Sequence, residues 1–222
     1  MAQGPQHPHP PGDSRANRLA TSPSLRPQQE VAGAGEVNQA HRLPAFFYRL
    51  SRRDQRCYLK SDAIDRFAFV PAAAATALTR KLTRTLESEA PQTAVNCEAQ
   101  ALVTEVCREI RVQPIRIQVR GVRPHNARGE LHGIFFPARP PLIVLWMRTA
   151  QRRDIVKPRT FVRTLLHELC HYLDYSLLGL SESFHTMGFF KRESFLVRTL
   201  CAPNEKAAGP DGHAPLQPGT GN

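Results

Sequence analysis

Two histidines that lie four residues apart, with a glutamate directly after the first, are the residues of this sequence best suited to chemistry. They occur in the stretch His167-Glu168-Leu169-Cys170-His171. On an α-helix, residues four apart lie one turn apart on the same face, so both imidazoles can reach one zinc ion at about 2.0–2.1 Å. Glu168 then lies beside the ion, where its carboxylate can take a proton from an activated water and pass it to a leaving group. The spacing predicts a zinc site with Glu168 as the general base.

A catalytic zinc needs a third protein ligand and one open position. His185 and Glu193 both follow the helix that carries the motif, beyond the helix-ending Gly179. We expect His185 to be the ligand, because imidazole suits zinc and a ligand carried by a loop needs no helical register. Glu193 is the alternative, and the two can also divide the work, one binding the metal and one supporting it. Asp174 is expected to orient a ligand without touching the ion.

The motif and the residues after it resemble the SprT-like and WLM metallopeptidases. In those enzymes HExxH is followed by a short loop and by a histidine with a phenylalanine four positions on, which here are His185 and Phe189. The resemblance implies zinc ligands at His167, His171 and His185 and a general base at Glu168. It also implies a compact zincin fold, in which a small sheet lies beside the active-site helix and an edge strand aligns the substrate. The similar part runs from about residue 142 to 200.

Hydrophobic periodicity predicts an α+β domain over residues 43–202. Apolar residues at helical spacing predict helices at 72–89, 93–111, 158–178 and 189–200. Alternating or continuous apolar residues predict strands at 115–121, 131–136 and 142–147. Residues 1–42 and 203–222 are rich in proline, glycine and polar residues, so we expect both to be disordered tails.

The charge and the cysteines limit the setting in which this chain works. With 30 Lys and Arg against 19 Asp and Glu, the net charge is +11, which favours polyanions such as nucleic acid as partners. The same charge also suits a solvated surface that binds no partner. The five cysteines are odd in number and include no CxxC pair, so we expect reduced thiols. No apolar run approaches the ~20 residues of a membrane span, and the first residues lack a signal-peptide pattern. We therefore expect a cytoplasmic protein without membrane association.

Together these expectations predict a zinc metallopeptidase that hydrolyses a peptide bond in a protein or peptide. The substrate is expected to lie extended along an edge strand, at 133–137 or at 142–147. A second hypothesis is a basic nucleic-acid-associated protein whose zinc is structural, with Asp174 or Glu193 completing a closed site. A third is a protease recruited to DNA by its basic surface. The variant Glu168→Gln distinguishes the first two hypotheses. An enzyme would keep its zinc and lose turnover, whereas a protein with a structural zinc would show no effect beyond stability.

Overall fold

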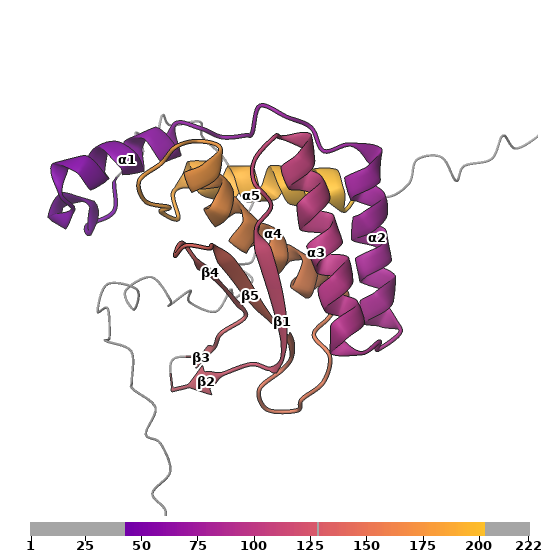
Figure 1. Ribbon diagram of the computed structural model, residues 1–222. Coiled ribbons are helices and arrows are strands. Elements are labelled where there is room, and N and C mark those ends of the chain that lie inside the picture. The colour runs from indigo at the N-terminus through magenta and orange to yellow at the C-terminus, as the bar shows by residue number, and fades with distance from the viewer. Residues whose placement is uncertain (1–42, 128, 203–222) are drawn as a thin grey trace, which may run out of the picture.

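The computed structural model describes residues 43–127 and 129–202, which form an α+β domain (Figure 1). The predicted disordered tails, residues 1–42 and 203–222, lie outside the described residues. Within that part the helices contain more residues than the strands. The predicted α+β class is confirmed. In chain order the elements are the 3-10 helix η2 (Phe47–Arg49), α1 (Arg52–Asp62), α2 (Ala73–Glu87), α3 (Gln92–Glu109), β1 (Arg116–Val122), β2 (His125–Asn126), β3 (Gly129–Glu130), β4 (Gly133–Phe136), β5 (Leu142–Arg148), α4 (Pro158–Ser176) and α5 (Met187–Leu200).

The helix α1 is the largest element that hydrophobic periodicity does not predict. Only Cys57, Tyr58 and Ser61 of its residues are buried, so it presents no apolar stripe of the usual width. Its start nevertheless carries a local signal. The Ser51 side chain accepts a hydrogen bond from the Asp54 backbone N–H, as expected for a serine followed three residues later by an acid. The capping pattern, and not hydrophobicity, marks this helix in the sequence.

The main sheet has three strands in the order β1-β5-β4, with β5 in the centre. β1 runs parallel to β5, and β4 runs antiparallel to it. Consecutive side chains of β5 are buried, so both faces of this central strand are covered, which explains why residues 142–147 are continuously apolar. The prediction that 142–147 could lie at an edge is therefore wrong, and the strand within 133–137 forms the edge. Helix α3 packs on β1, and α4 packs on β5 and β4 (Figure 1).

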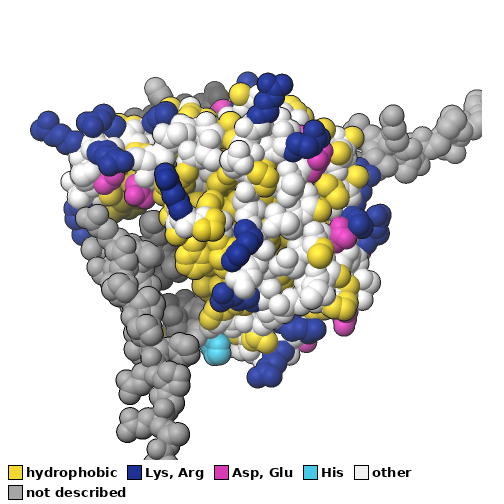
Figure 2. Space-filling model, viewed as in Figure 1, with side chains coloured by type: hydrophobic (Ala, Val, Ile, Leu, Met, Phe, Trp, Pro, Cys, Tyr) yellow, Lys and Arg dark blue, Asp and Glu magenta, His cyan; other side chains and the backbone are white. Residues whose placement is uncertain are grey.

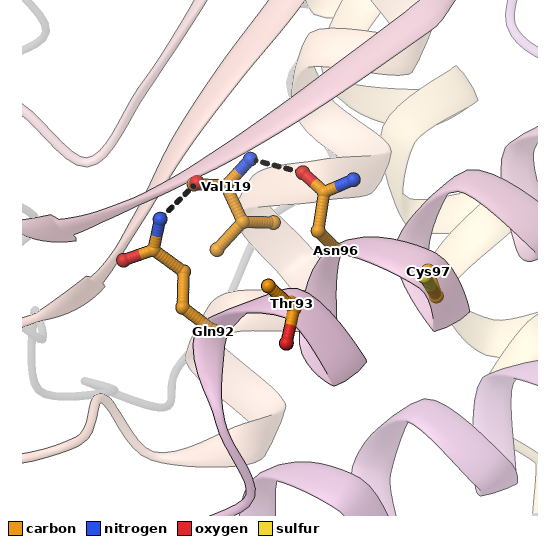
Figure 3. Close-up of a pocket in the computed structure, with 5 residues that line it drawn as sticks. All are labelled: Gln92, Thr93, Asn96, Cys97 and Val119. Atoms are coloured by element: carbon orange, nitrogen blue, oxygen red, sulfur yellow. Dashed lines mark hydrogen bonds between the residues drawn. The ribbon is translucent and has the colours of Figure 1, made fainter.

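The outer edge of β1 is closed by amide side chains from α3 that lie four residues apart. Gln92 Nε2 donates to the Val119 carbonyl at 3.0 Å, and Asn96 Oδ1 accepts from the Val119 N–H at 2.7 Å (Figure 3). One turn further along, Gln100 Oε1 accepts from the Ile117 N–H at 2.8 Å. These side chains take the hydrogen bonds that another strand would otherwise make. Of the two edges of this sheet, the one formed by β1 is therefore hydrogen-bonded to side chains of α3.

Gly188, in the first turn of α5, allows that helix to lie directly against the end of α1. The Gly188 N–H donates to Asp62 Oδ1 at 3.2 Å. A Cβ at this position would meet three backbone carbonyl oxygens, those of Ser61, of Asp62 at 2.6 Å and of Ile64 at 2.8 Å. Backbone atoms cannot rotate away as a flexible side chain does, so the contact requires glycine.

We expect Gly188→Ala to lower the free energy of unfolding by about 1–3 kcal/mol, since α5 must move away from α1. Urea denaturation followed by circular dichroism measures the change. Gly121→Ala is the matched control, because a Cβ there meets only Gln92 Oε1 at an ordinary 3.6 Å. We expect the control to stay within about 0.5 kcal/mol of wild type. Equal stability of the two variants would contradict the packing described for α5.

Candidate metal centre

Three histidine side chains from two segments meet at one point. His167 and His171 lie one turn apart on α4, and His185 comes from the loop just before α5. The Nε2 atom of His185 lies 3.1 Å from that of His167 and 3.0 Å from that of His171. Three nitrogens placed about 2.0–2.1 Å from one tetrahedral ion would lie ~3.3 Å from each other, which is close to this spacing. The three side chains can therefore hold a metal ion.

The hydrogen bonds on the far side of two rings determine which nitrogen faces the centre. His167 Nδ1 lies 3.2 Å from Glu193 Oε2, a carboxylate oxygen that accepts the Nδ1 proton. His171 Nδ1 lies 2.7 Å from Ser183 Oγ. That hydroxyl donates its own proton to Asp174 Oδ2 at 2.7 Å, so it must accept from His171. Both rings carry the proton on Nδ1, and their Nε2 lone pairs point to the shared centre.

The surroundings keep two of these imidazoles in the neutral form that binds metals. Burial is the main reason that the pKa of His171 lies well below its usual range, and the nearby His167 and His185 lower it further. His185 keeps part of its side chain exposed, but desolvation of its ring beside the other two histidines lowers its pKa to about 4, with the charge of His167 as the second cause. At neutral pH the rings of His171 and His185 are therefore uncharged and ready to act as ligands.

Two consecutive residues of α5 support the outer side of the cluster. Glu193, which contacts His167, also accepts from Arg163 Nε at 2.9 Å. Arg192 is fully buried, and its guanidinium donates to the two carboxylate oxygens of Asp174 at 2.9 and 3.2 Å. It also donates to the Ser61 carbonyl at 2.7 Å, which ties α1 to the same network. Burial raises the pKa of Asp174, and the bonds from Arg192 and Ser183 oppose that rise.

Glu168 is held between α4 and the edge strand β4. Its side chain is buried, and burial raises its pKa to about 7, while His167 and the Phe135 backbone N–H act in the opposite direction. The strand can approach this closely because position 133 is glycine. A Cβ at Gly133 would lie 2.7 Å from Thr164 Cγ2 and 3.0 Å from Glu168 Oε1. The carboxylate thus lies at the boundary between the helix of the histidines and the edge strand.

The structure separates the candidates that the sequence left open. His185 joins the two motif histidines, and Glu193 contacts the outer nitrogen of His167, a placement that fits the predicted arrangement in which His185 would bind a metal and Glu193 would support a ligand. Asp174 contacts Ser183, and through it acts on His171. Sequence reasoning missed both Ser183 and Arg192. Ser183 had a possible signal, since it lies two residues before His185, whereas nothing local marks Arg192 as buried.

Comparisons with known proteins found no relative of this chain. No protein-family model matches this chain, and neither a curated protein nor a solved structure matches it. Across residues 43–127 and 129–202, none of the helices has the length and apolar character needed to cross a membrane.

We expect Ser183→Ala to weaken metal binding about 10- to 100-fold, because His171 loses the partner that fixes its ring and its Nδ1 proton. Competition for zinc against a chromophoric chelator measures the affinity. Ser176→Ala is the control, since Ser176 is the last residue of α4, is exposed, and donates to the Tyr172 carbonyl and not to a histidine. If both variants bind zinc as wild type does, Ser183 does not orient His171.

Proposed function

We propose that this chain is a zinc-dependent metallopeptidase of the SprT-like type, which hydrolyses peptide bonds in proteins or peptides. The observation that carries the proposal is the convergence of the His167, His171 and His185 Nε2 atoms, with the buried Glu168 carboxylate set between them and the edge strand β4. A metal site, a carboxylate able to move protons and a strand edge are the three parts that peptide hydrolysis at a metal needs. The small sheet beside α4 agrees with a zincin fold.

The donor set favours zinc, and its surroundings favour a site open to substrate. Imidazole nitrogens suit zinc, and three protein ligands with one free position are typical of catalytic zinc. His185 is exposed, so one side of the cluster faces solvent. Glu193 and Asp174, the residues expected to complete a closed structural site, are instead engaged with Arg163 and Arg192. This arrangement argues against the hypothesis of a purely structural zinc.

Glu168 is the residue suited to moving the proton during hydrolysis. Zinc, when bound, lowers the pKa of a water and polarises the carbonyl of the scissile bond. With a metal bound, the Glu168 carboxylate would accept a proton from the attacking water and would then deliver it to the departing amine nitrogen. Its burial against Gly133 and its bond to the Phe135 backbone limit its orientations and keep the carboxylate away from bulk solvent.

The outer edge of β4 is suited to binding an extended peptide as a fourth strand. The Trp146 N–H donates to the His132 carbonyl across the antiparallel pair of β4 and β5. Because the pattern alternates along a strand, the backbone groups of Gly133 and Phe135 point away from β5, and of these the Phe135 N–H is engaged by Glu168. The opposite edge of the sheet is closed by the α3 amides. Backbone pairing at β4 would bring the scissile carbonyl beside Glu168 and the histidines.

Nucleic-acid binding stays a prediction that rests on charge. Lys and Arg side chains surround an apolar patch on the face of the molecule shown in Figure 2. Arg120 of β1 is exposed, and its guanidinium carbon lies 6.0 Å from the centre of the Trp146 ring. A basic surface of this kind suits a polyanion, and the binding it predicts weakens steeply as salt rises.

We expect Glu168→Gln to retain about one zinc per chain and to lose hydrolysis of a protein substrate by ~10²- to 10⁴-fold, because the amide cannot accept a proton. Elemental analysis measures the zinc, and cleavage of a labelled unfolded protein such as casein measures the activity. Glu105→Gln on α3 is the control, since that half-buried carboxylate pairs with Arg108 and is not part of the histidine cluster. His185→Ala should lose both zinc and hydrolysis.

Two outcomes would contradict the proposal. The first is that the wild-type protein, purified without chelator and then offered zinc, binds no metal. This result would remove the basis for any metal chemistry. Hydrolysis by Glu168→Gln at the wild-type rate would assign the general base elsewhere.

A further inference from the structure

A surface cavity of about 490 Å³ lies along the outer side of α5 and is not used by the proposed catalytic groups. Three of its lining residues are apolar, Met187, Phe190 and Phe195, and together they are called its floor. Met187 and Phe190 are among the few large apolar side chains that are exposed, at 49% and 43% of their surface. A cluster of exposed apolar groups in a hollow is typical of a binding surface.

The cavity lies beside the candidate metal centre. The Phe190 ring stacks on the ring of His185, with 5.7 Å between their centroids and 17° between their planes. Met187 follows His185 by two residues and begins α5. Phe190 therefore contacts both the cavity and one histidine of the cluster, so a chain bound at the metal would pass close to the cavity.

The rim of the cavity is basic. Lys191 and Arg198 of α5 and Arg66 of the segment between α1 and α2 line it, together with one acid, Asp65. Three cations against one anion leave two positive charges. None of the three cations forms an ion pair with another residue of the described chain. An acidic ligand would provide the partners that these side chains lack.

We propose that this cavity is the binding site for an acidic, apolar segment of the protein substrate, on one side of the scissile bond. The inference rests on the proposed function, and it adds the kind of sequence that the enzyme prefers. A large apolar side chain of the substrate would fill the floor at Phe190 and Phe195. Neighbouring Glu or Asp side chains would pair with Lys191 and Arg198.

The dimensions and the charges favour a peptide over a nucleic acid. From Met187 to Arg198 the helix rises about 16 Å, which an extended peptide of about five residues spans. A phosphate chain would place charge over the apolar floor and beside Asp65, where it gains nothing. A peptide that combines apolar and acidic side chains matches both the floor and the rim.

The test uses two fluorescein-labelled peptides of equal length, one with a single Phe flanked by Glu and one with Lys in place of each Glu. The full chain carries Glu168→Gln, so that the bound peptide is not cleaved, and fluorescence anisotropy gives the dissociation constants. We expect the Glu peptide to bind at least about tenfold more tightly than the Lys peptide. The double substitution Lys191→Glu and Arg198→Glu should remove that preference, and Phe190→Ala should weaken the binding of both peptides.

Arg116→Glu and Arg152→Glu together form the matched control, since both arginines are exposed, lie on β1 and on the loop before α4, and do not line the cavity. This control changes the net charge equally and should keep the preference. Equal binding of the two peptides to the unsubstituted cavity overturns the inference. An oligothymidylate that binds more tightly than the Glu peptide, and loses its affinity in the Lys191 and Arg198 variant, also overturns it.

Hydrolysis of casein by wild type separates this inference from the proposed function. If wild type cleaves casein but shows no preference for the Glu peptide, the peptidase proposal stands and the inference fails. If the Glu peptide binds as expected and wild type cleaves neither casein nor the peptide, the cavity is a binding site and the peptidase proposal fails.

Discussion

The buried ion pair between Arg192 and Asp174 is the interaction on which the candidate site depends. Both side chains are fully buried, so removing either one would leave an uncompensated charge away from water. The pair fixes the position of Asp174, which holds the Ser183 hydroxyl, which in turn orients His171. The same guanidinium binds carbonyls at the end of α1. One cation therefore connects α1, α4 and α5 to the geometry of a single histidine ring.

A second constraint concerns the two edges of the small sheet. An unpaired edge invites association with other chains, and proteins generally block it. Here three amide side chains of α3 occupy the edge of β1, at the cost of placing Gln92, Asn96 and Gln100 on one face of a helix. The edge of β4 has no comparable ladder among the described residues and lies beside Glu168. The asymmetry is consistent with a sheet that is protected on one side and used for binding on the other.

Much of the fold follows from local patterns. The apolar spacing of the long helix predicts α4 within two residues of its observed end, and the uninterrupted apolar run predicts the buried strand β5. The short pair β2 and β3 and the helix α1 escape that reasoning, since both contain mostly polar residues and owe their conformation to contacts elsewhere in the chain. Tyr58 of α1, for example, contacts the Phe184 ring, far away in the sequence.

The sequence by itself determined the pair His167 and His171 and the place of Glu168 beside them, because helical geometry is local and relates residues four apart without any knowledge of the fold. Only the tertiary structure decided that His185 joins the pair while Glu193 supports it from outside. It also decided that Gly133 brings the edge strand against Glu168 and that Arg192 is buried beneath the site. Those outcomes depend on contacts between distant segments, and residue spacing along the chain does not encode how closely two segments pack.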